Sequence, residues 1–207
     1  MAVASAVIAL FSLAVSGVTL FFTQFRGPQI STAIGPTIEI YYPSDGGLGV
    51  YVPATFVNTS PRTGTVHRCG ITIFRKSCPD EKFFMDWRFF MKLKPELSYA
   101  FDAPAHAIAV VGTSSTTQVL WFTWRYFSTP ELIITEGEYV LTFHYWLGAD
   151  DKPHSDHHEF SIDQPTHAQL AEYKSNNDST TVNLLLDNRI AANRLLSDAE
   201  SRSLLDA

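Results

Sequence analysis

The 24 residues after Met1 form a hydrophobic segment, residues 2–25, that contains no charged residue and ends before Arg26. A helix of this length would extend roughly 36 Å, more than the hydrocarbon core of a bilayer, which is about 30 Å thick. No Lys or Arg precedes the segment, and the apolar run continues past its one passable cleavage site, Ala14-Val15-Ser16, which favours an anchor over a cleaved signal peptide. The sequence therefore predicts one N-terminal transmembrane helix.

Downstream of this segment, hydrophobic and polar residues alternate along several stretches, a pattern typical of half-buried strands. The clearest stretch covers residues 83–92, where Met85 and Trp87 fall on the face opposite Asp86. Turn-forming Gly, Pro, Asn and Ser residues separate the stretches. The same reasoning predicts strands over residues 37–42, 50–58, 66–75, 105–112, 118–127, 138–147 and 158–162.

About eight strands without a convincing long helix predict a mainly β protein. We expect an antiparallel β-sandwich, Ig-like in the loose sense, with a small barrel as the alternative. In the C-terminal extension we expect a short helix over residues 167–174, a strand over 181–186 and a poorly ordered, at best helical tail over 190–205. The predicted organisation is an anchor over residues 1–26, a spacer over 27–36, the sandwich over 37–163 and the extension over 164–207.

The order of these features resembles a group of uncharacterised bacterial single-span membrane proteins. The resemblance rests on the anchor sequence IALFSLAVSGVTL (residues 8–20), on the basic residue Arg26 that follows it, and on the strand TIEIYYP (residues 37–43). It covers residues 3–75 and extends to the rest of the chain only in pattern. The resemblance implies membrane attachment and a β-rich body, and it implies no activity.

Composition and charge narrow the classes of partner. Hydrophobic residues make up 45% of the chain and charged residues 17%, which is enough apolar material for a folded core. The net charge is −6 and no block of Lys or Arg occurs, so we do not expect a nucleic acid as partner. Arg26 is the only charged side chain that flanks the anchor, which weakly favours a domain on the cytoplasmic face of the cell membrane.

The two cysteines, Cys69 and Cys78, are predicted to be free thiols. A strand over residues 66–75 would hold them too far apart for a disulfide, whose Cα atoms lie within about 7 Å of each other. We expect Cys69 to be buried and Cys78 to lie in a loop. Unbridged cysteines favour a reducing compartment.

Histidines near the end of the predicted sandwich form the first candidate site. His144, His154 and His157 could supply ring nitrogens to zinc or copper, with Asp156 close by in the sequence. However, His157 and His158 begin a predicted strand and should point to opposite faces of the sheet. A polar hairpin loop is the simpler interpretation, so no cofactor is predicted and metal binding stays an alternative.

Four tryptophans raise carbohydrate binding as a second alternative, because indole rings stack on sugars. Trp87 and Trp124 lie on the more apolar faces of their strands and are expected in the core, whereas Trp121 and Trp146 are expected nearer the surface. The chain has no Gly-x-Ser-x-Gly motif and no opposed pair of carboxylates for glycoside hydrolysis. We therefore expect a protein without enzymatic activity.

Small and hydroxyl residues recur along one face of the predicted anchor at spacings of three and four. In lipid such a stripe lets two helices approach closely and exchange hydrogen bonds. Alternatively, it is merely tolerated, because each hydroxyl can bond the carbonyl of the preceding turn. The stripe residues are Ser5, Ala9, Ser12, Ser16 and Thr19.

Taken together, the sequence favours a membrane-tethered, non-enzymatic β-sandwich that binds another protein or scaffolds a complex, with self-association or docking through the anchor.

Overall fold

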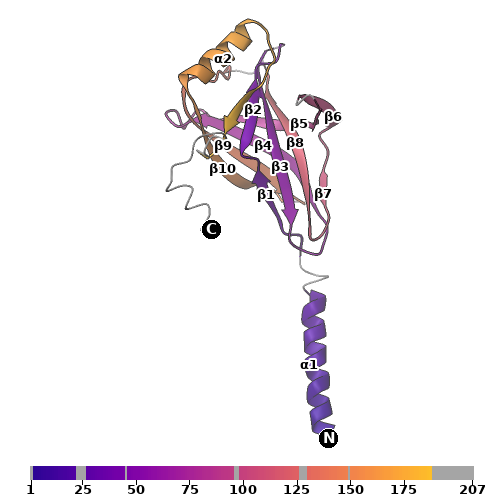
Figure 1. Cartoon of the computed structure of the whole chain (residues 1–207). Coiled ribbons are helices and arrows are strands. Elements are labelled where there is room, and N and C mark those ends of the chain that lie inside the picture. The colour runs from indigo at the N-terminus through magenta and orange to yellow at the C-terminus, as the bar shows by residue number, and fades with distance from the viewer. Residues whose placement is uncertain are drawn as a thin grey trace, which may run out of the picture.

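The computed structural model describes residues 2–21, 27–44, 46–95, 98–125, 130–148 and 150–187. Along these residues run two helices and eleven strands (Figure 1). The helices are α1 (Ala2–Leu20) and α2 (Gln164–Ser175). The strands are β1 (Ile30–Ile34), β2 (Thr37–Tyr41), β3 (Leu48–Asn58), β4 (Gly64–Arg75), β5 (Phe83–Leu93), β6 (Tyr99–Pro104), β7 (Ile108–Val110), β8 (Ser114–Trp124), β9 (Gly137–Leu147), β10 (His154–Ile162) and β11 (Val182–Leu185).

α1 lies on the segment that the sequence predicts as an anchor, and it has 19 residues. In the part of the chain that the structure describes, no helix is long and apolar enough to cross a membrane. The predicted transmembrane anchor is therefore wrong, and so are the integral membrane partnership, the single-pass localisation and the association through an anchor that depended on it.

The predicted helix-packing stripe lies on α1. Thr19 Oγ1 donates a hydrogen bond to the carbonyl of Val15 at 2.8 Å, the local bond that makes a hydroxyl tolerable within a helix. The side chain of Ser5 is outside the described part of the structure. The other stripe residues are exposed: Ala9, Ser12, Ser16 and Thr19.

All ladders of the β body are antiparallel, and they join the strands into one sheet. Its main path runs in the order β10-β9-β4-β5-β8-β3-β2-β11, with β1 on β3, β6 on β5 and β7 on β4. β5 is the joint: Phe83 to Asp86 pair with β4, and from Trp87 onward the strand pairs with β8. The mainly β, antiparallel prediction is confirmed. The predicted sandwich is wrong, because a strand shared by both halves makes them one continuous sheet.

The sheet curls until its end strands lie side by side. The Asp187 N–H donates to the Glu159 carbonyl at 2.6 Å, and the Asp187 carboxylate accepts from the Glu159 N–H at 3.0 Å. The same carboxylate bonds His158 Nδ1 at 2.8 Å. Nearer the start of β10, Thr32 of β1 donates to Asp156. One main-chain bond and several side-chain bonds thus link the two ends where no ladder does, and the sheet is nearly closed.

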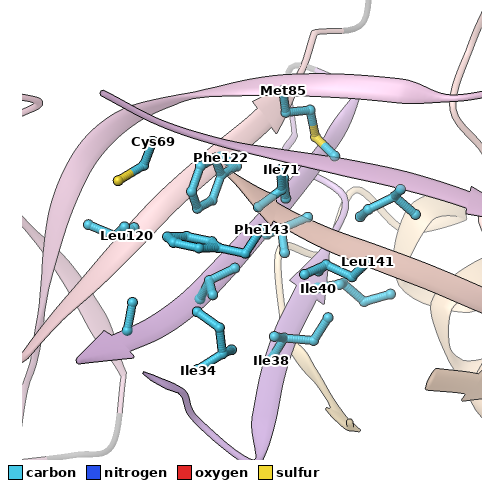
Figure 2. Close-up of a cluster of buried hydrophobic side chains, with 14 of the residues drawn as sticks. Ile34, Ile38, Ile40, Cys69, Ile71, Met85, Leu120, Phe122, Leu141 and Phe143 are labelled. Atoms are coloured by element: carbon cyan, nitrogen blue, oxygen red, sulfur yellow. The ribbon is translucent and has the colours of Figure 1, made fainter. Parts of the chain in front are cut away.

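The core lies inside the curl of this sheet (Figure 2). Phe122 and Phe143 pack edge to face near its middle, with ring centroids 6.3 Å apart. Alternation predicted these inward faces, since every second residue of a strand points to the same side. The largest fully buried side chains are Ile38, Ile40, Leu48, Phe56, Ile71, Ile73, Met85, Leu120, Phe122, Ile134, Leu141 and Phe143.

Several element bounds differ from the prediction. β1 lies within the stretch predicted as a spacer, β6 was not predicted, and β10 begins four residues earlier than expected. β6 carries no alternation because none of its side chains is buried. α2 and β11 confirm the helix and strand predicted in the C-terminal extension, and Asp163 caps α2 by accepting from the Thr166 N–H at 2.9 Å. The predicted tail over residues 190–205 lies outside the described residues.

A buried asparagine holds the turn between β3 and β4. Asn58 Nδ2 donates to the carbonyls of Arg62 at 2.7 Å and Val110 at 3.0 Å. Its Oδ1 accepts from the Ser60 N–H at 3.0 Å and hydroxyl at 2.9 Å. A Cβ atom at Gly112 would overlap the Pro61 carbonyl, so the neighbouring turn can approach this closely only with glycine there.

We expect Asn58→Ala to destabilise the protein by about 1–3 kcal/mol, because it leaves several buried donors and acceptors without a partner. Urea unfolding followed by circular dichroism measures the change. Asn183→Ala is the matched control, since Asn183 is exposed on β11, and it should stay within about 0.5 kcal/mol of the wild type. Equal losses in both variants would contradict the role given to the Asn58 side chain.

Candidate functional site

An aromatic row crosses the outer face of the sheet. The strand register sets Tyr51 of β3 opposite Trp121 of β8, and Trp121 opposite Phe89 of β5. The rings of Phe89 and Trp121 stack with centroids 5.2 Å apart and planes 4° from parallel. These rings form one wall of a surface groove of about 950 Å³.

Two further tyrosines contact the Tyr51 end of this row. Tyr41 stacks on Tyr51 with ring centroids 5.2 Å apart, and Tyr99 of the β5–β6 hairpin approaches Tyr51 to 4.8 Å. A Cβ atom at Gly49 would overlap the Tyr41 ring, so glycine at this position allows that ring to lie flat across β3. The aromatic surface is therefore held by contacts within the protein.

A β-bulge turns an arginine toward the same groove. The pairing of β5 with β8 shifts register between Trp87 and Phe89, which leaves Arg88 as the extra residue. Arg88 and Phe89 both line the groove, together with Arg125. Among the described lining residues there is no Asp, Glu, His or Cys, so this described lining carries positive charge and no acid–base pair.

The groove tyrosines are neutral hydrogen-bonding groups. Burial, followed by a hydrogen bond with Tyr41, raises the pKa of Tyr51, and burial also raises the pKa of Tyr99, with the nearby Glu39 carboxylate adding to it. Their hydroxyls thus stay protonated across the physiological range. Trp121 Nε1 is closed to solvent and has no acceptor among the described residues. Leaving a buried donor unpaired costs free energy.

The four tryptophans occupy different surroundings. Trp87 is buried, as predicted, and its Nε1 donates to the Phe89 carbonyl at 2.9 Å. Trp124 is half-buried against the core. Trp121 and Trp146 are half-buried rather than fully exposed. Phe89 covers one face of Trp121, and the Arg68 guanidinium lies 4.8 Å from the Trp146 ring centre.

The structure does not bring the three candidate metal ligands together. His154 and His157 lie in strand β10 and not in a loop, and an odd spacing within a strand puts them on opposite faces. His154 stacks on Tyr145, with ring centroids 5.2 Å apart, whereas His144 and His157 share the outer face. Within the described ranges, no group of three His, Cys, Asp or Glu residues could hold a metal ion.

His144 is the centre of a hydrogen-bonded chain on the outer face. Its Nδ1 lies 2.8 Å from Ser155 Oγ and its Nε2 lies 2.8 Å from Thr72 Oγ1. His157 Nδ1 bonds Thr142 Oγ1 at 2.9 Å. Burial, and to a smaller extent the neighbouring His157, lowers the pKa of His144. Both ring nitrogens of His144 are therefore occupied in the folded protein.

The cysteines lie where the sequence predicts. Cys69 is buried, Cys78 is exposed, and both are free thiols. Burial raises the pKa of the Cys69 thiol, which keeps it protonated and unreactive. The sequence predicted both environments because the burial of each cysteine depends only on its own strand or loop.

Comparison with known proteins does not assign the chain to a family. No protein-family model matches the chain, and no curated protein resembles it in sequence. The Spo0M sporulation control protein of Bacillus subtilis aligns at 11% identity and a TM-score of 0.33, over 73% of this chain and 56% of its own. A family 123 glycoside hydrolase of Clostridium perfringens aligns at 8% identity and a TM-score of 0.32, over 65% and 27%. Likenesses this weak carry no argument about function.

We expect only Cys78 to react with a maleimide in the native protein, because Cys69 is buried and becomes accessible only on unfolding. Mass spectrometry before and after adding urea counts the modified thiols. Cys78→Ser should remove all native labelling. Rapid modification of Cys78→Ser without urea would show that Cys69 is not enclosed.

The lowered pKa of His144 predicts a loss of stability in acid. Because the folded state resists protonation, stability is complete above the unfolded value of about 6.5 and declines as the pH falls below it. Urea unfolding at pH 7.5 and 5.0 should show a smaller decline in His144→Gln than in the wild type. NMR titration of the ring protons checks the cause, and a His144 midpoint above 6.5 would contradict it.

Proposed function

We propose that this domain is a non-enzymatic protein-interaction module that binds its partner in the aromatic groove. The observation that supports this function is the aromatic row of Tyr51, Trp121 and Phe89, flanked by Arg88. Tyr, Trp and Arg are the residues that contribute most to binding energy at protein interfaces. A groove of about 950 Å³ is large enough for several side chains of a partner.

The charge of the groove indicates the chemistry of the partner. Arg88 is exposed, and the described lining holds no carboxylate. A partner segment that presents Asp or Glu beside aromatic or aliphatic side chains would match both the guanidinium groups and the rings.

Catalysis is a poorer explanation for the groove. General acid–base chemistry needs titratable groups within hydrogen-bond reach of the reacting atoms. The ionisable side chains in the described lining are arginines and tyrosines, and neither carries a proton that it exchanges readily near neutral pH. Binding without chemistry is the function these groups support.

Selection of peptides from a random display library against the purified full chain tests the proposal. We expect enriched peptides to combine acidic and aromatic residues and to shift the Trp121 indole N–H resonance in NMR spectra. Arg88→Gln should weaken binding about tenfold, the value of one charge-assisted hydrogen bond. Trp121→Ala should weaken it about thirtyfold, as for a truncated hot spot.

Arg62→Gln is the matched control, because Arg62 is an exposed arginine in the distant β3–β4 turn. Near-UV circular dichroism verifies that each variant is folded. The proposal fails if Arg62→Gln and Arg88→Gln bind the selected peptides equally. It also fails if oligosaccharides, and no peptides, shift the Trp121 resonance, which would favour a carbohydrate-binding module.

A further inference from the structure

A second, smaller hollow lies where β5 leaves β4 and passes to β8. It has a volume of about 290 Å³. Cys69 and Trp87, both buried, lie at its base. The polar side chains around it are His67, Arg68, Asp86, Arg88 and His106.

Two β-bulges contribute side chains to this pocket. The pairing of β4 with β9 shifts register between Val66 and Arg68, which leaves His67 as the extra residue. The pairing of β5 with β8 shifts in the same way at Arg88. Bulges redirect side chains and occur often beside functional sites. Two of them at one pocket place His67 and Arg88 at a common rim.

The second arginine of the pocket is held in a fixed orientation. Asp86 Oδ1 accepts from Arg68 Nε at 3.0 Å and from Nη2 at 2.6 Å. The Arg68 guanidinium lies over the rings of Trp146 at 4.8 Å and Phe84 at 5.6 Å. The negative charge of Asp86 is thereby paired with Arg68, while the remaining N–H groups of the Arg68 guanidinium stay available as donors.

His106 presents one free ring nitrogen. Its Nδ1 lies 3.0 Å from the Pro104 carbonyl, and because a carbonyl can only accept, Nδ1 carries the proton. Nε2 is then an acceptor in the neutral ring and a donor in the imidazolium. The ring packs against Phe90 at 4.7 Å, and the Ala105 N–H donates to the Arg88 carbonyl at 2.9 Å. These contacts fix the loop that carries His106 beside Arg88.

We propose that this pocket binds a tetrahedral oxyanion of the phosphate class. The pocket lining contains two arginines, two histidines and one carboxylate, and that carboxylate, Asp86, is already paired with Arg68. The cluster stands out on a chain whose net charge is −6. Guanidinium groups match the geometry of phosphate oxygens. The inference goes beyond the proposed function and does not depend on it, although Arg88 lines both hollows.

The experiment is a titration of the full chain with inorganic phosphate at constant ionic strength, with chloride as the reference anion. NMR resonances of the His67 and His106 rings and of the Arg88 side chain report on the pocket. We expect saturable shifts with phosphate and none with chloride.

Four variants separate the pocket from general charge effects and from the groove. Arg88→Gln and His106→Gln should each weaken phosphate binding by at least about fivefold, whereas Arg62→Gln should bind as the wild type does. Trp121→Ala should also retain phosphate binding, so failure of the groove proposal would leave this one standing. Shifts that do not saturate, that chloride reproduces, or that are equally weakened in Arg62→Gln would overturn the site.

Discussion

The change of partner along β5 is the constraint on which the rest of the structure depends. Its first four residues pair with β4, and the strand then continues along β8. Because a strand's main-chain groups must be satisfied along its length, this change requires a local break in register. Arg88 occupies that break. The same joint turns one half of the sheet back over the other and encloses the core between them.

Both proposed binding sites follow from that joint. On one side, Asp86 is still in register with β4 and can hold Arg68. On the other, Phe89 is in register with β8 and can stack on Trp121. Arg88 lies between them and lines both hollows. A polar pocket and an aromatic groove therefore meet at one residue without any loop being needed to join them.

The sequence was sufficient to predict the features that depend on residues close together in the chain. Alternation predicted the inward positions of Met85 and Trp87, and the burial of Cys69 followed from its strand. What it missed depends on pairing between distant strands. The groove exists because residue 51 meets residue 121, and residue 121 meets residue 89; no pattern within one segment reports this register. His154 was misplaced for a related reason, since its loop composition hid the start of β10.

The two ways in which the sheet is joined should differ in rigidity. At β5, main-chain ladders run through the joint, and removing them would expose many buried groups at once. At the opposite seam, β10 meets β1 and the segment after β11 through a few bonds. These come chiefly from Asp187, which adopts a positive φ of 59°, and from Thr32 to Asp156. A seam held by a few isolated bonds opens at lower free energy than a ladder does. The candidate sites lie at the rigid joint, so their geometry is set before any ligand arrives, and little ordering cost opposes binding there.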